Sequence, residues 1–369
     1  NRNISGLLKE IINKINQTEV EVVSIDIPSG LFSEDNSLNK IEGIIKAKYT
    51  LCFNSPKLSF VLPENYQFVG EFHVLDIGLD RDFISSLNSK YYYLTKDFFS
   101  NRVKFRNKFD HKGSFGHLLI VSGSKGMMGS TVLTSRAALS SGVGKLSILS
   151  PKCGEHILQT TVIEGILEQN NGRNYLTDSY NLKYDWIVVG PGIGTNSETK
   201  SFLISLLKKV KTPIVLDADA INIISNENKL LSFIPENSIL TPHPKEFERL
   251  VGKWKSDINK LSLLKNFSKK YKLICILKGA NTSICLPNGN IYFNSSGNPG
   301  MASAGSGDVL TGIIGSLLAQ GYSPEISSKL GVYIHGLAGD YAKEKFGEIS
   351  MTSSNIQEFI SLAFKKLLI

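Results

Sequence analysis

Residues 297–308 read Gly297-Asn298-Pro299-Gly300-Met301-Ala302-Ser303-Ala304-Gly305-Ser306-Gly307-Asp308 and run into an apolar segment, 309–318, that predicts a helix. Glycines let backbone N–H groups approach an anion, and a helix start carries roughly half a unit of positive charge. This stretch therefore predicts a phosphate site. Asp308, in the first helical turn, could act as general base for a substrate hydroxyl or could only cap the helix and complement its dipole.

Around this stretch, short apolar runs alternate with helical ones. The pattern predicts a parallel sheet covered by helices on both faces. We expect strands at 117–121, 145–149, 186–189, 214–216 and 273–277, and helices at 130–141 and 198–208. Residues 281–286 and 291–294 predict a hairpin across 287–289.

Glycine-rich or polar loops follow the expected strands. In open α/β sheets, ligands bind beyond the carboxyl ends of the strands, so we expect these loops to line one crevice. Besides the stretch quoted above, the loops are 122–126, 190–194, 217–219, 241–246 and 278–282.

Four side chains in these loops have both a functional and a structural interpretation. His243 could contact substrate or could simply begin a helix at Pro244. Asp217 and Asp219 could bind magnesium directly or through water, whereas Asp219 could equally cap a helix over 220–225. Lys278 could meet a phosphate or remain solvated.

Composition limits the class of protein. The 369 residues suggest two domains, and 41% hydrophobic with 20% charged residues is typical of a soluble globular protein. The net charge of +8 comes from lysines scattered over expected helix faces, so we expect no nucleic-acid partner.

Four cysteines without zinc-ligand spacing favour a location in the reducing cytoplasm. No apolar run approaches the roughly 20 residues that span a bilayer, so we expect no membrane partner.

The first 80 residues predict a helix at 6–16 and strands at 20–25, 49–53 and 71–77. These are too few for a closed α/β domain, so we interpret residues 1–80 as part of one. Residues 81–107 form an expected linker whose aromatics, such as Phe98 and Phe99, pack onto one domain. Residues 108–369 form the second expected domain.

The loop motifs, in this order, resemble those of the ribokinase-like domain of NAD(P)H-hydrate dehydratases over roughly 108–368. The matching segments are KGSFGH at 112–117, GPGIG at 190–194, LDADAIN at 216–222, LTPHPKEFERL at 240–250, LKGANT at 277–282 and NPGMASAGSGD at 298–308. Residues 1–80 resemble the carboxyl-terminal part of an NAD(P)H-hydrate epimerase domain, which is Rossmann-like. The segments that carry this likeness are Asn1-Arg2, VSIDIPSGL at 23–31, KAKYT at 46–50 and VGE at 69–71.

The first resemblance implies a lyase that dehydrates the S epimer of hydrated NADH or NADPH with ADP or ATP and Mg²⁺. The products would be the reduced cofactor, phosphate, and AMP from ADP or ADP from ATP. By resemblance, Asp308 is catalytic and contacts the reacting hydroxyl. The resemblance also implies that the hydrate contacts Ser130, Gly194 and His243, with Ser130 standing where the family usually has alanine. The nucleotide is implied to contact Lys278, Gly279, Ala280, Asn281, Thr282, Gly305, Ser306 and Gly307.

The second resemblance implies that Asp26 contacts the hydrate and that Ser29 helps to bind K⁺. The asparagine- and glycine-rich motif that comes earlier in that family is not found in this sequence, so we expect no epimerase activity from residues 1–80. We expect a homo-oligomer. Two alternatives are a vitamin-precursor kinase of the same superfamily, which would leave a stable phosphorylated product, and a non-enzymatic dinucleotide-binding module.

Overall fold

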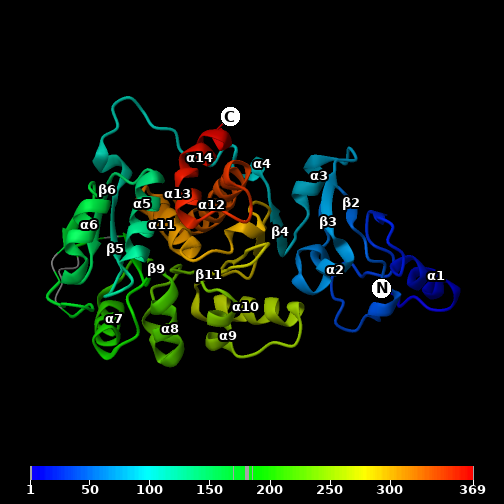
Figure 1. Cartoon of the computed structure of the whole chain (residues 1–369), viewed down its shortest axis with the longest axis horizontal. Helices are drawn as coiled ribbons and strands as arrows, with labels where there is room; N and C mark the ends of the chain where they lie inside the picture. Colours follow the sequence, from blue (N-terminus) through cyan, green and yellow to red (C-terminus); the bar gives the residue numbers. More distant parts are fainter. Residues whose placement is uncertain (1, 169, 179–182, 185, 369) are drawn as a thin grey trace. The chain divides into compact units, whose positions relative to one another are not determined.

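The structure is a computed structural model that describes residues 2–168, 170–178, 183–184 and 186–368, so Asn1 lies outside the described residues. The chain divides into two compact units (Figure 1). One comprises Asn1–Tyr93 and Lys253–Leu263, and the other comprises Leu94–Gly252 and Leu264–Ile369. The domain limits expected at residues 80 and 107 remain a prediction.

The first unit contains a three-stranded parallel sheet in the order β1-β2-β3. One cluster of its core gathers apolar side chains such as Leu31, Cys52 and Phe68. The elements are α1 (Leu7–Asn16), β1 (Val23–Ile25), β2 (Tyr49–Phe53), α2 (Tyr66–Val69), β3 (Glu71–Leu75) and α3 (Arg81–Ser86). The first strand is shorter than the sequence pattern predicts, because Val20 is exposed and lies before the pairing with β2.

The larger sheet has the order β4-β13-β12-β11-β10-β9-β8-β5-β6-β7. Strands β5 to β11 pair in parallel, and β12 and β13 form the antiparallel hairpin expected from the sequence. The strands are β4 (Tyr91–Leu94), β5 (His117–Val121), β6 (Lys145–Leu149), β7 (Ile166–Glu168), β8 (Trp186–Val189), β9 (Val215–Leu216), β10 (Ile239–Leu240), β11 (Ile274–Leu277), β12 (Ser283–Cys285) and β13 (Ile291–Asn294). The prediction of a mostly parallel sheet is confirmed.

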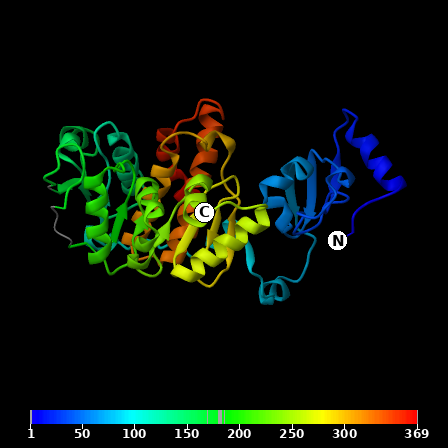
Figure 2. The same ribbon diagram turned by 90° about the horizontal axis from the view of Figure 1, so that it is seen from below.

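Helices cover both faces of this sheet (Figure 1). One layer contains α5 (Met128–Ser140), α11 (Ser306–Ala319), α12 (Pro324–Phe346), α13 (Ser353–Glu358) and α14 (Ile360–Leu368). The other contains α7 (Ser197–Lys209), α8 (Ala218–Asn226), α9 (Pro244–Val251) and, from Leu264 onward, α10 (Asp257–Tyr271). Figure 2 turns this side toward the viewer. The short helices α4 (Lys96–Phe99) and α6 (Glu155–Thr161) complete the set. Among the described residues, no helix combines the length and the apolar character needed to cross a membrane.

Helix α11 is the most buried helix of its layer, with every residue from Val309 to Ala319 buried. It packs closely against α5 and β8 because two of its contact positions are glycines. A Cβ on Gly312 would lie 2.2 Å from the carbonyl oxygen of Thr134, and one on Gly315 would lie 2.4 Å from a methyl group of Val188. This close packing fixes where the helix begins, and with it the position of Asp308.

The aromatic side chains of α4 pack within the second unit, as the sequence predicts. Phe99 is fully buried and its ring lies 4.8 Å from that of Tyr333, while Phe98 lies 6.2 Å from Tyr292. The backbone N–H of Lys104 donates a hydrogen bond to the Tyr322 hydroxyl at 2.8 Å. The chain is therefore tied down well before β5 begins.

We expect Gly312→Ala to destabilise the protein by about 1–3 kcal/mol, because the new methyl group must displace backbone that is itself packed. Gly129→Ala is the matched control, since Gly129 also lies in a helix but faces open space. The control should be neutral or stabilising by up to about 1 kcal/mol. Urea unfolding measures both, and equal midpoints for the two variants would contradict the packing argument.

Candidate active site

The order of the strands reverses between β5 and β8. From β5 the chain continues outward through β6 and β7, whereas from β8 it continues in the other direction through β9, β10 and β11. Such a switch point opens a crevice at the carboxyl ends of the two central strands. The loops after these strands are joined there: Gly123 N–H donates to Pro191 O at 3.0 Å, and Ser124 Oγ donates to Gly192 O at 2.8 Å.

Further hydrogen bonds connect the remaining expected loops to this crevice. Gly194 N–H donates to Asp219 Oδ2 at 2.9 Å, which links the loop after β8 to the loop after β9. The backbone N–H of Lys278 donates to Pro242 O at 3.0 Å, and its Nζ donates to Asp217 Oδ1 at 2.9 Å. The structure therefore brings together all five strand-end loops singled out in the sequence.

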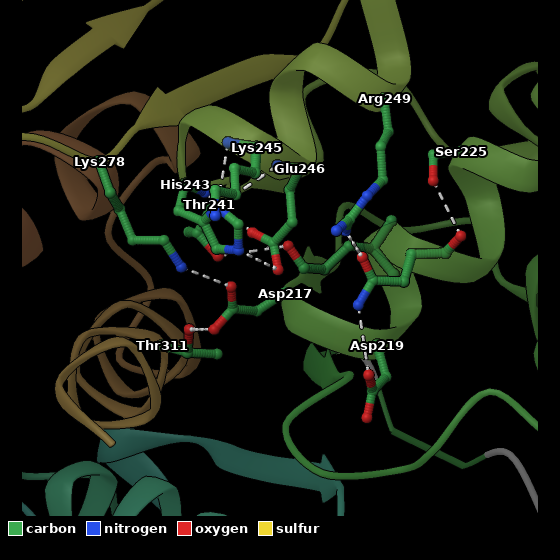
Figure 3. Close-up of polar contacts among 12 residues, drawn as sticks. Asp217, Asp219, Ser225, Thr241, His243, Lys245, Glu246, Arg249, Lys278 and Thr311 are labelled. Atoms are coloured by element: carbon green, nitrogen blue, oxygen red, sulfur yellow. Dashed lines mark hydrogen bonds and ion pairs between the residues drawn. The ribbon is translucent and has the colours of Figure 1, made fainter. Parts of the chain in front are cut away.

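Asp217 lies at the centre of the site and is almost completely buried, with 1% of its side chain exposed (Figure 3). Its Oδ1 accepts from Lys278 Nζ, and its Oδ2 accepts from Thr311 Oγ1 at 2.7 Å. Lys278 is therefore not simply a solvated side chain. Through its one carboxylate, Asp217 links the loop after β9 to the loop after β11 and to α11.

The ammonium of Lys278 lies beside the first turn of α11. A Cβ built on Gly307 would approach Lys278 Nζ to 3.2 Å, so the glycine leaves room for the ammonium at this position. Positive charge from the lysine and from the helix start thus converges on one point. This is the electrostatic arrangement that binds a phosphate group.

Asp308 is the third residue of α11, while the N-cap position is Gly305 in the left-handed region at φ 88°. The structural alternative that Asp308 caps the helix is therefore wrong, although its charge still complements the helix dipole. Burial, and next the charge of Asp217, raise the pKa of Asp308 to about 6 against a hydrogen bond from Ser130 and the charge of Lys278. A carboxyl group with this pKa can exchange a proton near neutral pH.

His243 begins a helix, which is the structural role expected from the sequence, and its side chain also faces the site. It is the N-cap of α9, where its Nδ1 accepts from the backbone N–H of Lys245 at 3.1 Å, and the Glu246 carboxylate accepts from His243 N–H at 2.8 Å. An accepting Nδ1 leaves Nε2 as the N–H donor of the neutral ring. Burial and the nearby Lys278 lower the pKa of His243, which favours that neutral form.

Asp219 does not cap the helix that follows β9, so the prediction that it could be the N-cap of that helix is wrong. Helix α8 begins at Ala218, one residue earlier, so Asp219 lies in its first turn and turns its carboxylate toward Gly194. Its second oxygen accepts from Asn222 Nδ2 at 3.3 Å. In the part of the chain that the structure describes, no three His, Cys, Asp or Glu side chains gather closely enough to hold a metal ion.

The two expected nucleotide loops are each held by local contacts. Thr282 Oγ1 donates to Gly279 O at 2.9 Å and Asn281 Nδ2 donates to Asn294 O at 3.0 Å, so Gly279 and Ala280 stay exposed at the tip. In the other loop, Ser306 Oγ lies 3.2 Å from His335 Nε2. With Lys278 beside Gly307, the two loops form one continuous edge of the site.

Several residues of the site were not identified from the sequence. Thr311 anchors Asp217, His335 supports Ser306, and Asp340 accepts from Gly297 N–H at 2.9 Å and from Asn298 Nδ2 at 3.0 Å. Thr311 lies one helical turn after Asp308, which is a signal that could have indicated it. His335 and Asp340 lie on α12, and nothing in their local sequence connects them with the glycine-rich loop.

Asp26 and Ser29 lie in the first unit, after β1. Asp26 adopts φ 63°, a left-handed conformation that is uncommon for a residue with a side chain. Its Oδ1 accepts from Lys57 Nζ and from Phe53 N–H, and the bond from Lys57 lowers the pKa of Asp26. Ser29 is exposed, and its carbonyl oxygen accepts from Ile45 N–H at 3.0 Å.

Comparison with known proteins identifies two families. The NAD(P)H-hydrate dehydratase family model matches residues 118–362, and the model of the YjeF-related protein N-terminus matches residues 1–59. The bifunctional NAD(P)H-hydrate repair enzyme of Moorella thermoacetica is 33% identical over 373 residues, which is 98% of this chain and 70% of that protein. The ADP-dependent (S)-NAD(P)H-hydrate dehydratase of Neisseria meningitidis is 39% identical over 257 residues, 68% of this chain and 84% of that protein.

A solved structure supports the fold. A ribokinase-like superfamily protein from Enterococcus faecalis superposes with a TM-score of 0.66 at 25% identity, over 76% of this chain and 98% of that one. The prediction of a ribokinase-like α/β fold is therefore confirmed.

We expect Asp308→Asn to stabilise the protein at pH 8. Folding raises the pKa of Asp308 from 3.8 to about 6, so the folded state is penalised as the pH rises through this window and the carboxyl group ionises. Asparagine carries no charge, so the variant does not pay this ionisation penalty. Its free energy of unfolding at pH 8 should therefore be higher than that of the wild type by about 1–3 kcal/mol. The gain should vanish near pH 4. Urea unfolding at both pH values measures it, and a variant less stable than wild type at pH 8 would contradict the electrostatic argument.

Proposed function

The chain belongs to the NAD(P)H-hydrate dehydratase family, and from this premise we propose that its second unit performs nucleotide-dependent dehydration of hydrated NADH or NADPH at the site around Asp308. The observation that carries the residue assignment is a partly buried carboxyl group with a pKa of about 6, two residues after the start of a helix whose N-terminal charge would favour a phosphate group. A base for a hydroxyl group and a cradle for a phosphoryl group are the two parts that this reaction needs.

In the proposed reaction, the hydroxyl oxygen on the reduced ring attacks the terminal phosphoryl group while ionised Asp308 accepts the hydroxyl proton. The bond between that phosphorus and the bridging oxygen breaks, so the shortened nucleotide leaves. The phosphate ester then departs as inorganic phosphate, a proton leaves the adjacent ring carbon, and the ring double bond is restored. Phosphorylation thus converts a poor leaving group into a good one.

The other residues of the site position these reactants. Lys278 and the N–H groups of Gly305 and Gly307 would stabilise the transferring phosphoryl group. The Ser306 N–H already donates to Ser303 O at 3.3 Å, so Ser306 would contact the nucleotide through its hydroxyl group. The 278–282 loop would border the same edge for the rest of the nucleotide. The Nε2 of His243 lies 3.4 Å from Glu246 Oε1, and in the neutral ring it would donate to the hydrate in place of that carboxylate. Ser130 already bonds Asp308, and Gly194 is held by Asp219, whose charge also acts on Asp308, so we propose that both residues contact the hydrate beside the base.

We propose that Mg²⁺ reaches the site bound to the nucleotide phosphates. The oxygens of Asp217 are taken by Lys278 and Thr311, and those of Asp219 by Gly194 and Asn222. This donor set does not fit a cation held directly by the two carboxylates, but it allows contact through water, which Mg²⁺ commonly keeps. When bound, the ion would neutralise phosphate charge. The name of the Neisseria relative favours ADP over ATP as co-substrate.

For the first unit, we propose that residues 1–80 are the carboxyl-terminal part of an epimerase domain and that 81–107 connect it to the domain at 108–369. Asp26, held ionised by Lys57, would contact the hydrate. Ser29 could supply at most one ligand to K⁺, because its carbonyl oxygen already accepts a hydrogen bond from Ile45 N–H.

The four free cysteines support a cytoplasmic location, and we also propose a homo-oligomer.

We expect Asp308→Asn to fold and bind nucleotide but to lose at least about a hundredfold in turnover, because the amide keeps the shape yet cannot accept the hydroxyl proton. The assay follows reduced-nicotinamide absorbance with prepared hydrate, Mg²⁺ and either ADP or ATP. Released inorganic phosphate distinguishes dehydration from a kinase reaction, which would leave a stable phosphorylated product. Near-normal turnover of the variant would overturn the catalytic assignment.

The pH profile gives an independent test. Because Asp308 must be ionised to accept a proton and its pKa is raised to about 6, kcat/KM should fall about tenfold per pH unit below pH 6 and level off above it. A carboxyl group with its ordinary pKa of 3.8 would place this limb two units lower. An activity that stays constant between pH 7 and pH 5 would therefore contradict the assignment.

A further inference from the structure

A pocket of about 330 Å³ lies away from Asp308, at the carboxyl ends of β6 and β7. It is bordered by Ser150 and Lys152 after β6, by Gln159 on α6 and by Asn171 after β7. Its volume is at the lower end of the roughly 300–1,000 Å³ of ligand pockets. It can therefore take part of a dinucleotide, and none of the residues assigned above lines it.

The position of the pocket relative to the site follows from the strand order. From β9, which carries Asp217, to β6 the sheet order is β9-β8-β5-β6, or three strand spacings. At about 4.8 Å each, these amount to about 14 Å along the carboxyl edge. The path crosses the β8/β5 switch point, and dinucleotides in open α/β sheets bind across such a point.

A segment after β7 connects the pocket with the crevice. Gly172 O accepts from Lys152 N–H at 2.9 Å, Arg173 O accepts from Cys153 N–H at 3.0 Å, and Asn174 O accepts from Lys125 N–H at 2.9 Å. Lys125 belongs to the glycine-rich loop after β5, so the path from the crevice to the pocket is continuous.

This path is basic, whereas the pocket itself has acidic side chains beside Lys152, the lysine that it shares with the path. Lys125, Lys152 and Arg173 are all exposed, and the charge of Lys125 acts on the Cys153 thiol beside Lys152. Within the pocket, two carboxylates, Glu155 and Glu168, disfavour a phosphate group. Apart from Lys152, which belongs to the basic path, the remaining lining combines hydroxyl, amide and apolar side chains, which suits a neutral nucleoside that hydrogen-bonds at its edge and packs through its base.

We propose that this pocket binds the adenosine half of the hydrated dinucleotide, with the basic path of Lys125, Lys152 and Arg173 meeting its diphosphate. The proposal rests on the proposed function. It divides the site into a reacting end on one side of the switch point and an anchoring end on the other. The co-substrate nucleotide, at the 278–282 loop, lies farther along the sheet in the opposite direction.

The test fills the pocket with Gln159→Trp. Gln159 is exposed on α6, so the variant should fold. We expect KM for hydrated NADH or NADPH to rise at least about tenfold, equivalent to about 1.4 kcal/mol, while KM for ADP or ATP stays unchanged. The hydrate of the reduced nicotinamide mononucleotide lacks adenosine, so its KM should be unaffected. His156→Trp is the matched control, because His156 is exposed on the same helix but does not line the pocket.

An unchanged KM for the dinucleotide hydrate, or an equal rise for the mononucleotide hydrate, would overturn the proposal. A binding measurement separates its failure from failure of the proposed function. ADP-ribose, which lacks the reacting ring, should bind the wild type by calorimetry in saturating ADP and should bind Gln159→Trp at least about tenfold more weakly. If the wild type turned over no hydrate, the function would fail while this binding difference would still support the pocket. Equal ADP-ribose affinity in both proteins would overturn the pocket assignment.

Discussion

The buried carboxylate of Asp217 is the constraint on which the site depends. An ionised group with 1% exposure is costly unless both oxygens have partners, and here they are Lys278 and Thr311. Asp217 follows β9, Lys278 follows β11 and Thr311 lies on α11, so the need to satisfy one charge fixes two strand-end loops and a helix relative to each other. Removing any one partner would leave a buried charge or hydroxyl group unsatisfied.

The properties of Asp308 are a consequence of this arrangement. Helix α11 can lie against α5 and β8 only because Gly312 and Gly315 have no side chains, and this places Asp308 near Asp217. The charge of Asp217 adds to burial in raising the pKa of Asp308. The same Asp217 holds the lysine that supplies positive charge beside Gly307. One carboxylate therefore contributes both to the basicity of the neighbouring carboxyl group and to the phosphate site.

Helix α12 contacts the glycine-rich loop through two side chains. His335 contacts Ser306, and burial lowers the pKa of His335 to about 4, so its ring is neutral at physiological pH. Asp340 accepts two hydrogen bonds from the start of the glycine-rich loop. A loop rich in glycine has many accessible conformations, and contacts from a buried helix reduce that freedom. The loop is thus ordered by residues that would not be suspected of a role from their sequence position.

The sequence by itself determined the β-α order, the strand-end loops and the residues of the glycine-rich stretch, because periodicity, turn chemistry and short motifs are local properties of the chain. It also limited the choices at Asp308, His243 and Asp219 without deciding them. Those choices depend on contacts between distant segments: the N-cap at Gly305 excluded capping by Asp308, the start of α8 at Ala218 turned Asp219 toward Gly194, and His243 proved able to hold a helix while facing the site. The partners of Asp217, the supports on α12 and the pocket beyond the switch point were likewise decided only by the tertiary structure, because burial and charge interactions arise when the sheet brings the strand ends together.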